Sequence, residues 1–489
     1  MSSTSLTSLP QLIQGGMGIG VSNWRLARAV SRAGHLGVVS GTVIDTVMVR
    51  RLQDGDPGGH VRRALAHFPI PAIAEEMLHR YFQANGRAPD APYRLLPMYR
   101  QVVSRARQRV TVAAAFVETW LAREGHDGLV GMNLLTKVQL PNLPTLYGAM
   151  LAGVSTIIMG AGIPREIPGA LDALAEHRPA ALRFDLEAAP RDVVEWITFD
   201  PADLWLGHGA PPSALVRPSF YPVVSAVSLA ATLARKSTGR VDGFVVESPT
   251  AGGHNAPPRG EMQLDASGQP VYGERDLVDF TRMRELGLPF WIAGGAGTPE
   301  GLDHALALGA AGIQVGTLFA FCNESGLDPA VRTSVLDAIR CGTASVFTDP
   351  LASPTGYPFK VIRGVPALEA TRTRICDLGY LRVAVRQEDG RVVYRCAAEP
   401  VDAYVAKGGK AEDTEGRRCL CNGLLSDIGL AQPREEDPEP ALVTSGDDLQ
   451  SVAMLAAEGS YGADDVIGWL TRATERRLEE PVVMAYART

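Results

Sequence analysis

The stretches PFWIAGG, residues 289–295, and AGIQVGT, residues 311–317, each consist of a short apolar run that ends in glycine. Apolar runs without polar alternation are typical of parallel strands that helices cover on both faces. A helix-like segment, residues 299–307, lies between the two runs. This order predicts two consecutive strand-and-helix units whose strands end in bare backbone amides.

Six further apolar runs precede these two, and most of them are followed by a helix-like segment. Eight strand-then-helix units predict an α/β fold, a closed (β/α)8 TIM barrel, with an open doubly wound sheet as the alternative. The order of the last two units favours the barrel. The expected strands are residues 12–14, 36–40, 130–134, 156–160, 223–227, 243–247, 289–293 and 312–316.

Two parts of the chain do not fit eight compact units. Residues 42–128 carry helix-like stretches and are too long for a loop in a compact domain, so they predict a helical insertion. Beyond residue 346 the alternation stops, and residues 381–394 predict a hairpin around an Asp-Gly turn. We therefore expect a barrel over residues 1–41 and 129–345, a helical insertion over 42–128, and a C-terminal domain over 346–489.

The composition indicates a globular protein, with 489 residues, 46% of them hydrophobic, and a net charge of −7. No basic stripe interleaved with aromatic residues favours nucleic acid as a partner. The N-terminus lacks the basic start and apolar centre of a signal peptide, and the longest apolar run, residues 149–163, is too short to span a bilayer. We expect a cytoplasmic protein that binds neither nucleic acid nor membrane.

The segment QGGMGIGVSN, residues 14–23, begins like a dinucleotide-binding fingerprint. Gly18 and Gly20 occupy the first two glycine positions of G-x-G-x-x-G, but Asn23 stands at the third. The next strand, residues 36–40, also ends without the acidic residue that would hold a ribose. The pattern therefore favours a different ligand for this glycine turn.

Three later positions are candidates for chemistry. The glycine ends of strands seven and eight, with Thr317 beside them, predict a phosphate site, because the loops after these two strands form the usual phosphate site of such barrels. His254 follows two glycines at the end of strand six, where an imidazole that titrates near neutral pH suits proton transfer. A structural histidine is the alternative reading.

Four motifs in order resemble the nitronate monooxygenase (2-nitropropane dioxygenase) superfamily, which includes FMN-dependent enoyl-acyl carrier protein reductases. They are IQGGMG at residues 13–18, AGGH at 251–254, AGG at 293–295, and IQVGTLF at 313–319 followed by Glu324-Ser325. The resemblance covers about residues 10–345. Residues 137–153 and 349–360 are similar to the trans-acting enoyl reductases of polyketide and polyunsaturated fatty acid synthases, whereas residues 255–260 depart from both groups.

The resemblance implies an FMN site. It implies that backbone at residues 16–18 lies against the flavin ring, that Asn133 forms a hydrogen bond to the ring, and that the two glycine ends bind the FMN phosphate. His254 would face the substrate beside the flavin. Gln14 is expected either to contact the cofactor or to form a hydrogen bond inside the barrel. The expected cofactor-binding residues are Gln14, Gly16, Met17, Gly18, Asn133, Gly253, Gly294, Gly295, Gly316 and Thr317.

The resemblance also implies an FMN-dependent oxidoreductase in which the flavin accepts electrons and the protein manages protons. The first expected reaction is oxidation of a nitronate or related carbanion with O2, with His254 as the base toward a neutral nitroalkane. The alternatives are a trans-acting NAD(P)H-dependent enoyl-thioester reductase, which would work with an acyl carrier protein, and a non-catalytic flavin-binding scaffold. Whether the protein is a homo-oligomer stays open.

Four of the six cysteines lie close together in the C-terminal third of the sequence. Cys376, Cys396, Cys419 and Cys421 can supply the four thiolates of a structural Zn²⁺ or iron–sulfur site. Such a site would stabilise a small domain that has little core of its own. Buried free thiols are the alternative.

Overall fold

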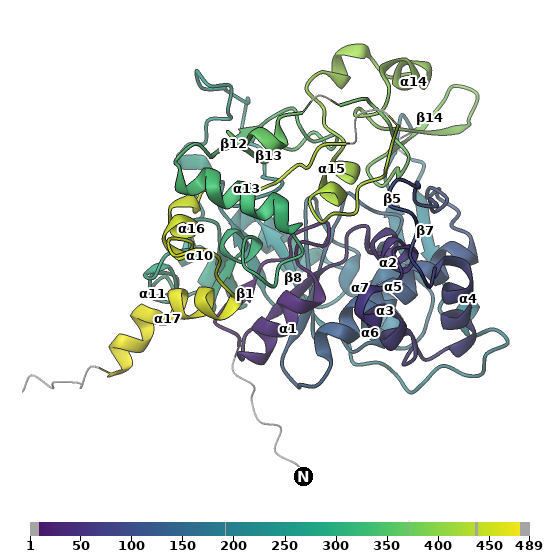
Figure 1. Ribbon diagram of the computed structural model, residues 1–489, viewed down its shortest axis with the longest axis horizontal. Coiled ribbons are helices and arrows are strands. Elements are labelled where there is room, and N and C mark those ends of the chain that lie inside the picture. Colours follow the sequence, from purple (N-terminus) through teal and green to yellow (C-terminus); the bar gives the residue numbers. More distant parts are fainter. Residues whose placement is uncertain (1–8, 191, 371, 436–438, 480–489) are drawn as a thin grey trace, which may run out of the picture.

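The computed structural model describes residues 9–190, 192–370, 372–435 and 439–479. Its centre is an eight-stranded parallel sheet with the strand order β1-β11-β10-β9-β8-β4-β3-β2 (Figure 1). A parallel bridge between Ile13 and Leu36 joins the first strand to the last, so the sheet closes and the predicted TIM barrel is confirmed. The barrel strands are β1 (Leu12–Gln14), β2 (Gly37–Ser40), β3 (Val130–Leu135), β4 (Thr156–Gly160), β8 (Ser219–Val224), β9 (Phe244–Glu247), β10 (Phe290–Ala293) and β11 (Gly312–Val315).

The barrel interior is filled by side chains from alternate strand positions. Trp291 is fully buried there, and its ring lies 4.6 Å from that of Tyr221. Its indole N–H donates to the Pro10 carbonyl at 2.7 Å. Successive strand residues point to opposite faces, so the remaining strand side chains pack outward against the helices.

Helices cover the outside of the barrel, and the first of them explains one departure from the dinucleotide pattern. The side chain of Asn23 accepts a hydrogen bond from the Leu26 amide at 3.0 Å, so Asn23 caps helix α1. The covering helices are α1 (Trp24–Arg32), α6 (Asn142–Leu151), α7 (Ile167–Ala175), α9 (Val227–Lys236), α10 (Phe280–Glu285), α11 (Gly301–Ala307), α12 (Thr317–Ala320) and α13 (Pro329–Arg340).

The segment between β2 and β3 is helical, as predicted. Its longest helix, α5 (Arg105–Arg123), begins at Ser104, whose hydroxyl caps the Arg107 amide, and packs against α6, α2 and α1. The other helices are α2 (Ile44–Gln53), the short 3-10 helix η1 (Pro57–Gly59), α3 (His60–Leu65) and α4 (Pro71–Tyr81).

The segment between β4 and β8 differs from the expected simple unit. It contains an antiparallel pair, β5 (Ala180–Phe184) and β7 (Glu195–Phe199), the short strand β6 (Leu186–Glu187) and helix α8 (Ala202–Trp205). Alternate residues of β5 are buried, as in a sheet with one solvated face. The fifth barrel strand ends at Val224 rather than Val227, because Val227 begins α9.

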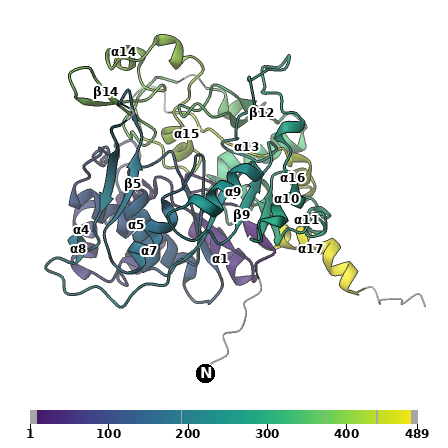
Figure 2. The same cartoon turned by 180° about the vertical axis from the view of Figure 1, so that it is seen from behind.

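The C-terminal part packs against the barrel (Figure 2). The predicted hairpin is confirmed, and its first strand also pairs in parallel with β6. The last helix, α17, contacts α1 and α11. The elements are β12 (Ser345–Asp349), β13 (Phe359–Arg363), η3 (Pro366–Leu368), the hairpin β14 (Val383–Arg386) and β15 (Val392–Arg395), α14 (Val401–Ala406), η4 (Ala411–Thr414), α15 (Leu420–Ser426), α16 (Leu449–Leu455) and α17 (Ala463–Glu479).

A buried polar cluster joins α2, α5 and the C-terminal part. The Arg107 guanidinium lies 2.6 Å from the Asp45 carboxylate, and the side chains of both residues are almost fully buried. The hydroxyls of Tyr99 and Tyr380 donate to the same carboxylate. Burial raises the pKa of Asp45, but Arg107 and the tyrosine hydroxyls outweigh it, so the net pKa is lowered.

No helix in the described part of the chain is long and apolar enough to cross a membrane.

Candidate active site

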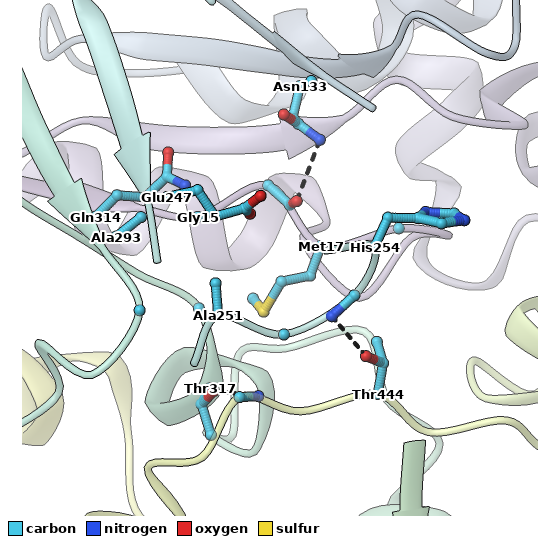
Figure 3. Close-up of a pocket in the computed structure, with 18 of the residues that line it drawn as sticks. Gly15, Met17, Asn133, Glu247, Ala251, His254, Ala293, Gln314, Thr317 and Thr444 are labelled. Carbon is cyan, nitrogen blue, oxygen red and sulfur yellow. Dashed lines mark hydrogen bonds between the residues drawn. The ribbon is translucent and has the colours of Figure 1, made fainter. Parts of the chain in front are cut away.

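A pocket opens at the carboxyl ends of the barrel strands (Figure 3). Carboxyl ends of parallel strands meet at one face of a barrel, so loops distant in sequence converge there. The glycine turn after β1 forms one side, and the ends of β3, β9, β10 and β11 form the others. The residues predicted from the sequence that line it are Gly16, Met17, Gly18, Asn133, Gly253, His254, Gly294, Gly316 and Thr317.

The glycine turn after β1 packs closely against β3. The Asn133 side-chain amide donates to the Gly16 carbonyl at 3.2 Å. A Cβ atom at Gly16 would clash with the Asn133 side chain, so glycine is required at this position. Met17 projects into the middle of the pocket (Figure 3), and its amide donates to Ser22 at 2.8 Å.

Gln14 lies outside this pocket lining, and its side chain forms hydrogen bonds inside the barrel. Its side-chain amide donates to the Ser22 hydroxyl at 2.7 Å and to the Gly15 carbonyl. Its side-chain carbonyl accepts from the Val38 amide at 2.9 Å. These bonds satisfy the polar groups of the fully buried side chain. Gln14 therefore has the position expected for a hydrogen-bonding residue of the barrel interior.

The two glycine ends have different positions. Gly294 has φ of 87° and lines the pocket, and a Cβ atom there would lie 2.5 Å from the Ser248 hydroxyl. Gly295 has φ of 68° and lies next to Gly294, just outside the pocket lining, so its expected phosphate contact stays a prediction. Gly316 is open toward the pocket, because only Met17 lies within 4 Å of where its Cβ would stand.

A segment near the C-terminal end of the described chain, residues 444–446, completes the pocket, and the sequence motifs did not predict it. The Gly446 amide donates to the Thr317 hydroxyl at 2.9 Å, and the Gly253 amide donates to the Thr444 hydroxyl at 2.8 Å (Figure 3). No local pattern distinguishes residues 444–446 from an ordinary loop, so only the folded chain reveals their place beside Thr317.

Glu247 and Gln314 are further lining residues that the sequence reading left out. Glu247 is the last residue of β9, and burial raises the pKa of its carboxyl to about 8. It has no hydrogen bond or ion pair to any residue that the structure describes, and the buried Gln314 carbonyl likewise lacks a described partner. The two residues flank Ala293 in the sheet register, and Figure 3 shows both at one end of the pocket. A polar residue closing an apolar strand was the available signal for Glu247.

His254 lies at the opposite end of the pocket from Glu247 (Figure 3). Its Nε2 atom lies 2.7 Å from the Ser353 hydroxyl, and its ring packs edge-on against Phe359 at 4.8 Å between centroids. Burial lowers the pKa of His254 to about 4, so the imidazole is neutral at physiological pH. Its Nδ1 atom forms no hydrogen bond to the described residues and is the nitrogen left for a ligand.

The four C-terminal cysteines do come together, but not as the expected metal site. All are free and line one small cavity. Within the described ranges, no group of three or more His, Cys, Asp or Glu side chains is arranged to hold a metal ion. Burial raises the pKa of Cys419 to about 11, so this thiol is protonated at physiological pH when no metal is bound. The geometry matches the alternative of buried thiols.

Comparison with known proteins gives matches in the same region. Residues 216–353, from β8 to the loop that contains Ser353, match the family model for nitronate monooxygenase. A nitronate monooxygenase of Pseudomonas aeruginosa is 30% identical over 208 residues, which cover 42% of this chain and 52% of that protein. A probable nitronate monooxygenase of Bacillus subtilis is 33% identical over 103 residues, 21% of this chain and 28% of that protein. The chain therefore spans about half the length, or less, of these relatives.

Among solved structures, FabK from Thermotoga maritima aligns over 97% of this chain and 95% of its own, with 17% identity and a TM-score of 0.43. The chain is thus similar to nitronate monooxygenases over residues 216–353 and over the 208 residues aligned with the Pseudomonas aeruginosa protein.

Proposed function

We propose that this pocket binds FMN and that the protein is an oxidoreductase that oxidises a nitronate or a related carbanion with O2. The observation that carries the proposal is the convergence of the glycine turn, Asn133, two strand ends and a neutral histidine on one pocket. The match of residues 216–353 to nitronate monooxygenases supports the same reaction class.

The lining fits a flavin mononucleotide in chemical character. Gly294 and Gly316 would hold the phosphate with the Thr317 hydroxyl, because backbone without side chains lets an anion approach the amides. Gly16 would lie against the ring system. The unpaired Gln314 carbonyl offers a buried acceptor, which a ring N–H would satisfy. When bound, FMN supplies the electron acceptor for the reaction.

The protein's own part is to position the substrate and to move a proton. His254 is neutral at physiological pH and its Nδ1 atom is without a bond to the described residues, so it can accept a proton from the α-carbon of a neutral nitroalkane. A preformed nitronate has already lost that proton and needs no base. Glu247, protonated below about pH 8, offers a hydrogen-bond donor at the other end of the pocket.

Enoyl-thioester reduction is the second candidate function. Residues 349–360, which resemble the trans-acting enoyl reductases, lie against His254 through Ser353 and Phe359. In that case NAD(P)H would be the reductant and an acyl carrier protein the partner, and His254 would protonate the developing enolate. A cytoplasmic location remains a prediction for either reaction.

Two anaerobic mixing experiments test these functions. The purified protein should show flavin absorbance or take up FMN, and an alkyl nitronate alone should bleach that absorbance. Bleaching by NADPH but not by nitronate would replace the first function with the second. A flavoprotein that neither compound bleaches would support the non-catalytic scaffold, and a protein that takes up no FMN would contradict the cofactor assignment.

A further inference from the structure

The ring of His254 is the first member of a chain of hydrogen bonds that leads away from the pocket. Its Nε2 atom lies 2.7 Å from the Ser353 hydroxyl, which lies 2.7 Å from the Thr355 hydroxyl. The Ser353 oxygen also accepts from the Thr355 amide at 3.2 Å, and the Thr355 oxygen accepts from the Tyr357 amide at 3.4 Å. These amide bonds occupy one acceptor site on each oxygen, so each hydroxyl proton is free to lie along the chain.

The chain connects two separate cavities. Ser353 is fully buried, whereas Thr355 is half-buried and lines a second cavity of about 700 Å³ between β5 and β14. Charged side chains surround this cavity, among them Lys137, Arg183 and Arg417. The hydroxyl chain therefore runs from the half-buried His254 imidazole to a second cavity that charged side chains line.

The environment of His254 makes such a connection necessary for a proton acceptor. Burial is the cause of its lowered pKa, and the rings that pack on it, Tyr357 and Phe359, are uncharged. Two cations lie close by: Lys137 is 6.0 Å from the centroid of the Tyr357 ring, and the Arg417 guanidinium donates to the Ser353 carbonyl at 2.6 Å. An imidazolium in these surroundings is costly, so a proton gained on one ring nitrogen calls for the loss of a proton from the other.

We propose that Ser353 and Thr355 form a proton relay between Nε2 of His254 and the second cavity. The relay depends on the proposed function only for the source of the proton. Ser353 and Thr355 are positioning residues, because they act through the imidazole and touch no substrate.

In the transfer, the Cα–H bond of a neutral nitroalkane breaks, its electron pair stays on the substrate as the nitronate, and its proton forms an N–H bond on Nδ1. The Nε2 proton moves to the Ser353 oxygen, the Ser353 hydroxyl proton moves to Thr355, and the Thr355 proton goes to water. The ring stays neutral after the transfer. When Nδ1 later gives its proton to an acceptor in the pocket, the same chain returns a proton to Nε2.

The first test compares two substrates that differ only by the proton. Ser353→Ala and Thr355→Val should lower kcat/KM for a neutral nitroalkane about 100-fold, which is the size of loss expected when proton transfer is impaired. Both variants should leave kcat/KM for the preformed nitronate within about twofold of wild type. Thr355→Ser restores the hydroxyl and should recover the wild-type value. Equal activity of Thr355→Val and wild type on the nitroalkane, or equal losses in Thr355→Val and Thr355→Ser, would overturn the relay.

The second test does not require turnover. In protein labelled with ¹⁵N-histidine, the His254 signals are assigned by their loss in His254→Gln, and their shifts report the tautomer. We expect the Nε2–H tautomer in wild type and a changed tautomer ratio in Ser353→Ala with unchanged FMN content. An Nδ1–H tautomer in wild type, or an unchanged ratio in the variant, would overturn the relay. If wild type fails to oxidise either substrate, the proposed function fails, and this measurement still decides the relay.

Discussion

The substitution Tyr380→Phe probes the buried cluster that ties the C-terminal part to the helical insertion. The Tyr380 hydroxyl donates to Asp45, lies 2.7 Å from the Thr46 hydroxyl, and accepts from Arg107 at 3.0 Å. Phenylalanine keeps the ring and its packing, including the 5.9 Å contact between its centroid and that of Tyr99. The variant therefore removes hydrogen bonds and little else.

The expected loss of stability follows from the charges involved. A hydrogen bond to a charged group contributes roughly 1.5–3 kcal/mol, and an unsatisfied buried partner costs a further ~1–3 kcal/mol. Asp45 keeps Arg107 and Tyr99 as partners, which reduces the cost of leaving a buried partner unsatisfied. We expect the free energy of unfolding to fall by about 3 kcal/mol.

Urea unfolding, followed by tryptophan fluorescence, measures this change. Tyr404→Phe is the matched control, because the Tyr404 hydroxyl forms no hydrogen bond to the described residues although its ring is buried. The control should stay within about 0.5 kcal/mol of wild type, as is usual for substitutions that lose no such interaction. A Tyr380→Phe value equal to the control would refute the reasoning that this cluster stabilises the junction.

Three further outcomes are expected. The folded-state pKa of Glu247, about 8, lies above its ordinary 4.5, so its contribution to stability is full below pH 4.5 and is lost as the pH rises to about 8. Glu247→Gln removes this pH dependence of the unfolding free energy, whereas Asp427, whose pKa burial also raises to about 8, titrates in both proteins. The difference in unfolding free energy between wild type and variant should therefore change between about pH 5 and 9. A constant difference would contradict the raised pKa of Glu247. Gly294→Ala adds a Cβ at φ of 87° and should weaken FMN binding at least tenfold in a fluorescence titration, whereas Gly273→Ala, with open space at its Cβ, should leave the affinity unchanged. His254→Ala should keep FMN in absorbance measurements yet lose turnover of neutral nitroalkanes, and full activity would remove this residue from the mechanism.

Local sequence was sufficient for the barrel. Each strand carries its own apolar run, and several runs end at a glycine, so β4 and β10 lie within a residue of their predicted ranges. The same local reading found His254, because two glycines at a strand end mark a place where backbone and side chain face the open end of the barrel. It missed β5 and β7, since their alternating pattern lies within a segment expected to contain a simple connection.

The partners of the site residues came only from the tertiary structure. Ser353 bonds a histidine 99 residues earlier, and Gly446 bonds a threonine 129 residues earlier. The predicted metal site at the four cysteines is a second example. Sequence spacing brings Cys419 and Cys421 close together, but only the folded structure sets the directions of the four thiols. Periodicity and turn chemistry act over a few residues and can be read directly from the chain, whereas contacts between distant loops depend on how the closed barrel and the C-terminal part pack together.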